Sequence, residues 1–489
     1  MKGYLLRFIS LALAITLTML SLASCDLVNS IFGSQENEGD GEGGGEDDGT
    51  QTIMPASLNG VPVDDYYIVY DSSAPDYNKR AAEYISNTIY EITGLDLRVT
   101  EDGAVPKAHE IVVGETNRPI SDSLNEKTEG VEFAILAEDG HIALEGDYFV
   151  IAAAAYYFVY TYITDKALDI IVPEYPVIHE PIVEEANNYI FLIGDGMGEY
   201  QTRLFEHFDV ATEGELAYSD GEDIFYGYLL PYIAEVGTRS LTGVTDSAAG
   251  GTALASGYKT YNQHVGKDKD ENDVMSLTEL CGSLGMATAV MSTESKSGAT
   301  PASFSAHSYD RDEKANIIAS QLETTAKYGT IINCSFDYYT ASQIPRIETK
   351  ITETLTQLSR DEDGFFIMYE EAHIDKHCHN NQMDKAFNAI VRFNQAIGRF
   401  MEFCFYNPDT LLLITADHET GDLHVDEDGE WVYGSGDHTD KNVLLFAWGD
   451  GAEIFNAQTI ENVQIPKTIA SMLGVDEFGD MSKYPALTN

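Results

Sequence analysis

The chain has 489 residues, which leaves room for two or three domains and a large buried core. Its 81 Asp and Glu residues outnumber its 28 Lys and Arg residues and give a formal net charge of −53. This excess of negative charge argues against nucleic acid or an anionic membrane surface as a partner of the folded part. If the substrate is an anion, positive charge must be concentrated where it binds.

The N-terminus has the features of a secretion signal. Lys2 and Arg7 precede the apolar run FISLALAITLTMLSLAS, which leads into LASC at residues 22–25. This ending resembles a bacterial lipobox, and the resemblance implies cleavage before Cys25 and a lipid on its sulfur. The alternative is an uncleaved membrane anchor, because the run is nearly long enough to span a bilayer. We expect a signal peptide over residues 1–24 and a lipid-anchored protein outside the cytoplasm.

A flexible linker is expected next, over residues 25–56. This segment contains GDGEGGGEDDG, whose glycines favour no fixed conformation and whose carboxylates repel one another. The linker is expected to hold the folded part away from the membrane.

A small α/β accessory domain is expected over residues 57–183. YYIVYD and HEIVVGE predict strands, and YNKRAAEYISNTIYEITG predicts a helix that ends at Gly94. VEFAILAEDGHIALEG predicts a hairpin that turns at Asp139 and Gly140, and YFVIAAAAYYFVYTYI predicts a long apolar helix. The unit weakly resembles accessory domains beside the catalytic domains of some carbohydrate-active enzymes. It is interpreted either as a spacer or as a glycan-binding domain.

From about residue 187 apolar strands alternate with helices. NNYIFLIGDGMG, MATAVMSTE, GFFIMYEE and TLLLITADHE each end an apolar run in charged residues, and NVLLFAWGDG is another apolar strand. This alternation predicts an α/β fold over residues 187–489, with a doubly wound, mostly parallel central sheet and helices on both faces. Such sheets bind ligands at the carboxyl ends of their strands, where these acidic residues and histidines fall.

Several of these strand ends carry candidate metal ligands. Asp195, in GDGMG, is either a ligand or a turn-forming residue, and its carboxylate would repel the pyrophosphate of a dinucleotide. In YEEAHIDKHCHNN a helix would put Asp375 and His379 on one face, but His373 and His377 share that spacing, so both pairs stay open. The other candidate site residues, of which Arg311 is not a metal ligand and each of which also has an ordinary structural interpretation, are Thr300, Arg311, Glu370, Glu371, Asp417, His418 and His438.

GVTDSAAGGTALASG, residues 243–257, places a hydroxyl before a run of very small side chains. Ser247 is either a helix N-cap or a nucleophile at the positive end of a helix. Together with the candidate ligands it predicts a hydrolytic site with a serine and two or three metal ions. Histidines with carboxylates suit zinc, and hydroxyl and carboxylate oxygens suit magnesium.

The motifs IGDGMG, VTDSAAGGTA, ATPASFSAHSYDR, EEAHIDKHCH, TADHETG and DHT stand in the order found in the alkaline phosphatase family, which residues 187–475 resemble. The resemblance implies a phosphomonoester hydrolase that forms a phosphoserine on Ser247, with Arg311 binding the phosphate and with two zinc ions and one magnesium ion as cofactors. It implies these metal ligands: Asp195, Asp417 and His418 for the zinc beside the serine, Asp375, His379 and His438 for the second zinc, and Asp195, Thr300 and Glu370 for magnesium.

The chain departs from the family pattern beside the expected magnesium site. Gly298 stands where many members carry a polar residue near the magnesium, and Glu371 stands where a small residue is usual, so the family's magnesium affinity and turnover are not assumed. Asp246 is expected to support Arg311 and not to bind metal. Only 58 residues separate Arg311 from Glu370, so long surface insertions are not expected and the family's dimer is not assumed.

Other functions are open on the sequence alone. A phosphodiesterase or a sulfatase of the same superfamily is one alternative, but a sulfatase needs Pro two residues after its nucleophile, where this chain has Ala249. A cell-surface glycan-binding protein that uses residues 57–183 is another. The expected partners are small phosphate monoesters and, through Cys25, a membrane. No nucleic acid partner is expected, and the oligomeric state is not predicted.

Overall fold

The computed structural model describes residues 57–73, 76–124, 128–163, 169–209, 217–218, 224–334 and 344–488. The expected signal peptide, the lipid on Cys25 and the linker lie outside these ranges. Within them, no helix has the length and the apolar character needed to cross a membrane. The chain divides into two compact units: residues up to 182 together with 405–407, and residues 183–404 together with 408 onward.

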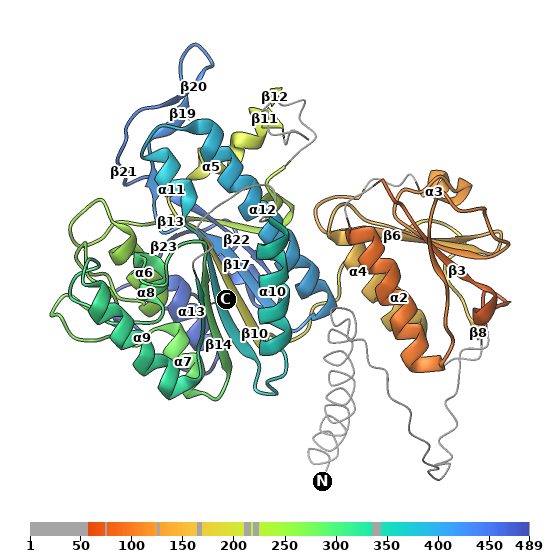
Figure 1. Ribbon diagram of the computed structural model, residues 1–489, viewed down its shortest axis with the longest axis horizontal. Helices are drawn as coiled ribbons and strands as arrows, with labels where there is room; N and C mark the ends of the chain where they lie inside the picture. The colour runs from red at the N-terminus through yellow and green to blue at the C-terminus, as the bar shows by residue number, and fades with distance from the viewer. Residues whose placement is uncertain are drawn as a thin grey trace, which may run out of the picture. The chain divides into compact units, whose positions relative to one another are not determined.

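The first unit is built on a six-stranded mixed sheet in the order β4-β3-β5-β7-β6-β9. Helices α2 and α4 pack side by side against it (Figure 1). A separate short sheet joins β1, β2 and β8. The elements are β1 (Ser57–Leu58), β2 (Val61–Pro62), β3 (Tyr67–Tyr70), α2 (Tyr77–Thr93), β4 (Val99–Glu101), β5 (Glu110–Val113), α3 (Pro119–Ser123), β6 (Phe133–Glu138), β7 (His141–Glu145), α4 (Val150–Phe158), β8 (Asp169–Ile170) and β9 (Val177–His179).

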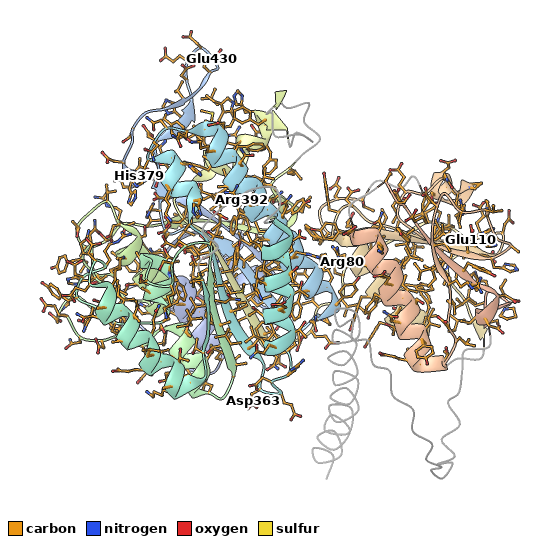
Figure 2. All side chains as sticks on the ribbon, in the orientation of Figure 1. Arg80, Glu110, Asp363, His379, Arg392 and Glu430 are labelled. Carbon is orange, nitrogen blue, oxygen red and sulfur yellow. The ribbon has the colours of Figure 1, made fainter. Side chains whose placement is uncertain are left out.

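Local sequence explains where these elements stop. Helix α2 ends at Gly94, which adopts the left-handed conformation with φ +75°. Strands β6 and β7 form the expected antiparallel hairpin, with Asp139 at φ +49° and Gly140 at φ +78°. Inside the unit, the Glu110 carboxylate accepts from Arg118 Nε at 2.8 Å, and the remaining Arg118 N–H groups also have acceptors (Figure 2 labels Glu110). This pair is therefore a satisfied structural contact.

The second unit is built on an eight-stranded sheet in the order β15-β14-β16-β10-β17-β22-β13-β23. The five strands from β15 to β17 are parallel to one another, β22 is antiparallel to both of its neighbours, and β23 is parallel to β13. The expected mostly parallel central sheet is confirmed. Its strands are β10 (Asn188–Gly194), β13 (Tyr232–Gly237), β14 (Ala287–Ser292), β15 (Ile331–Cys334), β16 (Phe365–Glu371), β17 (Thr410–Thr415), β22 (Val443–Trp448) and β23 (Thr459–Glu461).

Helices cover both faces of this sheet. Figure 1 shows α7 and α9 on one side of it and α10 and α12 on the other. Short strand pairs β18–β21 and β19–β20 follow β17. The bounds are α5 (Glu199–Thr202), α6 (Ser247–Ser256), α7 (Leu277–Ser283), α8 (Ala299–Ser303), α9 (Lys314–Tyr328), α10 (Ile344–Leu358), α11 (His373–Cys378), α12 (Met383–Tyr406), α13 (Gln464–Met472), β18 (Glu419–Thr420), β19 (Leu423–Val425), β20 (Trp431–Tyr433) and β21 (His438–Thr439).

The register of the parallel strands brings their carboxyl ends to one edge. Glu370, near the end of β16, pairs with Ser292 of β14 on one side and with Ile193 of β10 on the other. Ile193 in turn pairs with Thr415, the last residue of β17. The polar residues that follow these strands therefore meet at the same edge, as the sequence predicts for a parallel sheet.

Candidate active site

Ser247 is the first residue of helix α6 and is not its N-cap. Asp246 takes the cap position, and its side chain accepts from the N–H of Ala249 at 2.9 Å. One of the two interpretations left open by the sequence, Ser247 as cap, is therefore wrong. Ser247 is buried, and its hydroxyl, which does not cap the helix, lies 3.2 Å from His418 Nε2.

The small residues of α6 let the helix pack closely against the residues around it. A β-carbon at Gly250 would lie 2.9 Å from the carbonyl oxygen of Asp417, and one at Gly251 would lie 3.1 Å from Ser303 Oγ in α8. Both separations are shorter than ordinary van der Waals contact, so any larger side chain would push α6 away. The Ala and Gly run thus fixes the distance between Ser247 and the loop that carries Asp417.

Arg311 is held beside the serine by Asp246. Its Nη1 donates to Asp246 Oδ2 at 3.2 Å, and its backbone N–H donates to the carbonyl of Gln263 at 2.8 Å. Burial by itself would lower the pKa of Arg311, but the charge of Asp246 raises it overall, so the guanidinium stays charged. The expected support of Arg311 by Asp246 is present in the structure.

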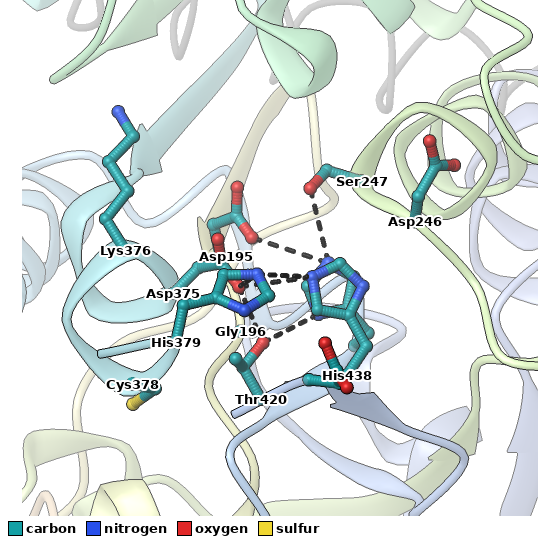
Figure 3. A network of polar contacts seen from close by, with 12 residues as sticks. Asp195, Gly196, Asp246, Ser247, Asp375, Lys376, Cys378, His379, Thr420 and His438 are labelled. Atoms are coloured by element: carbon teal, nitrogen blue, oxygen red, sulfur yellow. Dashed lines mark hydrogen bonds and ion pairs between the residues drawn. The ribbon is translucent and has the colours of Figure 1, made fainter. Parts of the chain in front are cut away.

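Two histidines face one another with ring nitrogens that are free to bind metal. His379 Nδ1 lies 2.7 Å from the carbonyl of Gly436, and His438 Nδ1 lies 2.8 Å from the carbonyl of Thr245. A carbonyl accepts only, so each Nδ1 carries a proton and each Nε2 of a neutral ring presents a lone pair. The two Nε2 atoms are 3.0 Å apart (Figure 3), and each lies 3.3 Å from Asp375 Oδ1, so a bound cation would contact all three atoms.

Thr420 ties the Asp375 carboxylate to the third histidine. Its hydroxyl donates to Asp375 Oδ1 at 2.6 Å and lies 3.3 Å from His418 Nδ1. The same Asp375 oxygen is 3.3 Å from Nε2 of both His379 and His438. Burial would raise the pKa of Asp375, but the hydrogen bond and charge of His438 and the charges of the other two histidines lower it overall.

Gly196 allows these side chains to approach β10. It has φ +74°, and a β-carbon there would lie 2.8 Å from both the Asp375 α-carbon and Thr420 Oγ1. The backbone N–H of Asp375 donates to the carbonyl of Asp195 at 2.9 Å. A residue with a side chain at position 196 would separate α11 from the end of β10.

Two overlapping groups of side chains have the geometry to hold metal ions. In each group, one ligand atom per residue lies within 4.8 Å of every other. Buried carboxylate oxygens Asp195 Oδ1, Asp417 Oδ2 and Glu370 Oε1 have no hydrogen-bond partner within the described ranges. The two groups are Asp375 with His418 and His438, and Asp195 with Asp417 and His418.

The electrostatics of these carboxylates also fit a cation. Burial, followed by the charge of Asp375, raises the pKa of Asp417 to about 7. Burial and then the charges of Asp417 and Asp375 raise the pKa of Asp195 well above its usual range. Acids crowded in this way repel one another, and a divalent cation among them would reverse that penalty. The donor set therefore fits divalent metal ions.

An oxygen-rich region adjoins these groups. Burial and then the charge of Glu294 raise the pKa of Glu370, while the hydrogen bond from the Ser292 hydroxyl acts in the opposite direction. The buried Thr300 Oγ1 has no hydrogen-bond partner within the described ranges. Thr300 is buried in α8, next to α6. Glu294, which the sequence did not single out, is part of this region.

The structure distinguishes the two residue pairs that have the same spacing in the sequence, Asp375/His379 and His373/His377. His373 Nδ1 lies 3.3 Å from Glu371 Oε1, and the same oxygen accepts from the His373 backbone N–H at 3.0 Å. Burial, followed by the charge of His373, lowers the pKa of His377. Glu371 and His373 therefore pair with each other, whereas Asp375 and His379 face His438.

The alkaline phosphatase family pattern matches residues 186–335 and 335–435. Among curated proteins, the chain is 26% identical over 309 residues to alkaline phosphatase 4 of Bacillus subtilis, covering 50% of this chain and 64% of that protein. It is 39% identical over 147 residues to streptomycin-6-phosphate phosphatase of Streptomyces griseus, covering 29% of this chain and 32% of that protein. The chain thus spans less than two thirds of the length of these relatives.

Solved structures agree in fold. Alkaline phosphatase from the Antarctic bacterium TAB5 superposes with a TM-score of 0.52 at 24% identity, covering 60% of this chain and all of that one. The cold-active enzyme from Shewanella gives a TM-score of 0.51 at 21% identity, covering 58% of this chain and 99% of that one. These likenesses show that the second unit has the same type of fold.

Proposed function

This chain belongs to the alkaline phosphatase family, and on that premise we propose that it hydrolyses phosphate monoesters through a phosphoserine intermediate on Ser247. One observation carries the proposal: Ser247 Oγ lies 3.2 Å from Nε2 of His418, which belongs to both groups of potential metal ligands. A serine hydroxyl is a weak nucleophile at neutral pH unless a base or a metal ion activates it. The buried position beside His418 provides for that activation.

We assign two zinc ions and one magnesium ion to this centre. Imidazole nitrogens with carboxylates suit zinc, and carboxylate and hydroxyl oxygens suit magnesium. When bound, these ions would stabilise charge on the phosphoryl oxygens and lower the pKa of the attacking hydroxyl. Asp195, Asp417 and His418 would hold the zinc beside Ser247. Asp375, His379 and His438 would hold the second zinc. Asp195, Thr300 and Glu370 would hold the magnesium.

The residues of the chain position the substrate and form the covalent intermediate. Ser247 Oγ attacks phosphorus and loses its proton, the bond from phosphorus to the ester oxygen breaks, and that oxygen leaves with a proton as an alcohol. Water then cleaves the bond from Ser247 to phosphorus and releases inorganic phosphate. Arg311, held by Asp246, donates to phosphoryl oxygens. The N–H groups at the start of α6 direct a partial positive charge toward the same anion.

The proposal is tested by hydrolysis of an aryl phosphate by the purified protein supplied with zinc and magnesium. Ser247→Ala should lower kcat by about a thousandfold or more, because the intermediate cannot form. Ser359→Ala, beyond the end of α10, is the control and should keep the wild-type rate. Hydrolysis that is unaffected by Ser247→Ala would contradict the mechanism. A rate on an aryl phosphodiester that exceeds the monoester rate would favour the phosphodiesterase alternative.

We also propose that a lipid on Cys25 holds the enzyme at the outer face of the membrane. The basic residues, apolar run and LASC ending at the N-terminus support this assignment. Cys25→Ser should move the protein from the membrane fraction to the soluble fraction. A variant that stays in the membrane would identify the uncleaved apolar run as the anchor.

A further inference from the structure

The space beside the α-carbon of Gly298 is occupied by the side chain of another residue. Its backbone angles, φ −58° and ψ 159°, are ones that any residue can adopt, so conformation does not require glycine there. A β-carbon at position 298 would lie 1.7 Å from Glu294 Oε1 and 2.3 Å from Glu294 Cδ. The carboxylate of Glu294 therefore occupies the volume that a side chain at position 298 would enter.

Hydrogen bonds hold Glu294 against the neighbouring strand end. Ser292 is the register partner of Glu370, and its hydroxyl donates to the Glu370 carboxylate. The same hydroxyl accepts from the Glu294 backbone N–H at 3.0 Å. The backbone of Glu294 is thus fixed to Glu370 through a single serine.

The side chain of Glu294 pairs with a lysine on α11. Lys376 Nζ donates to Glu294 Oε2 at 2.8 Å, and the two side chains are 46% and 19% exposed. Lys376 directly follows Asp375, one of the ligands assigned above. Because Lys376 takes Oε2, the other oxygen, Oε1, is the one that lies on the Gly298 side, at the start of the helix that carries Thr300.

One oxygen of each of two nearby carboxylates lacks a hydrogen-bond partner. Glu370 Oε1 and Asp195 Oδ1 are buried without a hydrogen-bond partner within the described ranges. These oxygens, like the Thr300 hydroxyl and the Glu294 carboxylate, are hard donors of the kind that magnesium prefers. The orphaned oxygens point to a cation here independently of the presence of Glu294.

We propose that Glu294 supplies a carboxylate to the magnesium site formed with Asp195, Thr300 and Glu370, from the end of β14 and in the place of a side chain at position 298. The proposal rests on the proposed function for the assignment of those three ligands. On this proposal, the magnesium site still has a polar group in the place next to Gly298. The polar group comes from four residues earlier in the chain.

Magnesium binding without substrate tests the proposal directly. Equilibrium dialysis of zinc-loaded protein against Mg²⁺ should give a dissociation constant about 10- to 100-fold higher for Glu294→Gln than for the wild type. Glu353→Gln, which breaks a Glu–Lys pair with Lys350 on α10, is the matched control and should leave Mg²⁺ affinity unchanged. An affinity of Glu294→Gln within twofold of the wild type would overturn the proposal.

A second variant separates a donor role from an effect of the Lys376 charge. Glu294→Gln leaves Lys376 unpaired near the site, and this charge would also repel Mg²⁺. The double variant Glu294→Gln/Lys376→Met restores the wild-type net charge. Weak Mg²⁺ binding in the double variant supports a donor role, and wild-type binding would show that Glu294 only neutralises Lys376.

Placing a carboxylate at position 298 tests whether side chains at positions 294 and 298 can occupy the same space beside the magnesium site. Gly298→Asp alone should displace the Glu294 carboxylate from its pair with Lys376, because the two side chains meet and carry like charge. In the Glu294→Ala background, Gly298→Asp should restore Mg²⁺ affinity to within about tenfold of the wild type. A double variant that binds no better than Glu294→Ala would count against a shared place.

These measurements also distinguish the inference from the proposed function, because binding is followed without turnover. A chain that hydrolyses monoesters but binds Mg²⁺ equally well with and without Glu294 would refute this inference alone. A chain whose Mg²⁺ affinity depends on Glu294 but which does not hydrolyse monoesters would refute the proposed function alone.

Discussion

The carboxylate of Asp246 uses each of its oxygens for a different contact. Oδ1 accepts from the Ala249 N–H and caps α6, and Oδ2 accepts from Arg311 Nη1 and from the Gln263 N–H. The start of the helix, the nucleophile that follows it and the guanidinium are therefore fixed by one side chain. The two roles can be separated because the cap needs only an oxygen, whereas Arg311 responds to the negative charge.

Replacing Asp246 should separate these roles. Asp246→Asn keeps a capping oxygen and should lose less unfolding free energy than Asp246→Ala, which also loses the cap, a further loss of about 1 kcal/mol. Both variants leave the Gln263 N–H without its carboxylate acceptor. Both variants should raise the inhibition constant of inorganic phosphate several-fold, because Arg311 loses its charged partner. Urea unfolding and phosphate inhibition of aryl phosphate hydrolysis measure the two effects. Unchanged phosphate inhibition in both variants would show that Arg311 does not depend on Asp246.

At the same scale, residue spacing could nominate ligands but could not choose among them. Asp375/His379 and His373/His377 have the same spacing. The family resemblance favours the first pair, and in the structure the pairing of His373 with Glu371 separates the two. Glu294 could not have been found from the motif, because a glycine at position 298 carries no information about which side chain fills its space. Such choices depend on contacts between segments that are distant in sequence.

At the scale of elements, helix α7 begins with a capping box that is extended by a histidine. Ser276 and Glu279 cap the helix reciprocally, and His307 Nε2 lies 3.1 Å from Glu279 Oε1. His307 Nδ1 lies 2.9 Å from the carbonyl of Gly266, so both ring nitrogens face acceptors and the doubly protonated ring satisfies both. Burial would lower the pKa of His307 and raise that of Glu279, but their mutual attraction outweighs burial in both.

This pair predicts a pH-dependent stability. The raised pKa of His307 stabilises the fold below its unfolded value of about 6.5, and this contribution is lost as pH rises through the folded value. The lowered pKa of Glu279 adds stability above about pH 4.3, which is lost as pH falls through its folded value. His307→Gln should therefore lower the urea midpoint more at about pH 6 than at about pH 9. An equal loss at both values would show that the histidine is neutral in the fold.

The order and direction of the strands were predictable only in part. Apolar runs ending in charged residues identify β10, β14, β16 and β17 and place their carboxyl ends at one edge, because parallel strands must share that edge. The antiparallel direction of β22 could not be predicted, since a buried apolar strand has the same pattern in both directions. Its direction is set by pairing with β17 and β13.

At the scale of the whole molecule, the distribution of charge opposes the binding of an anionic substrate. The net charge is −53, and the acids that converge at the active site add to the repulsion locally. The assigned metal ions would reverse the sign of the site within an acidic protein. They would also stabilise only the folded state, since the ligands come from separate segments that meet only after folding.

Removal of metal should consequently destabilise one unit and spare the other. At a free ion concentration about a thousandfold above the dissociation constant, each bound ion adds about 4 kcal/mol to the unfolding free energy. Chelation should lower the melting temperature of the second unit, where all the assigned ligands lie, and leave the unfolding of the first unit unchanged. Calorimetry with and without a chelator measures this. A single transition that does not shift would refute the structural contribution of the ions.

The crowding of Glu294 against Gly298 restricts the order in which mutations could move a carboxylate between the two positions. A sequence with acidic side chains at both positions would be overcrowded, and one with neither would lack that carboxylate. Each single step between the two arrangements therefore passes through a disfavoured state, so the two positions are epistatic. Sequences of this fold that keep a carboxylate in this place should carry it at one position or at the other, and only rarely at both.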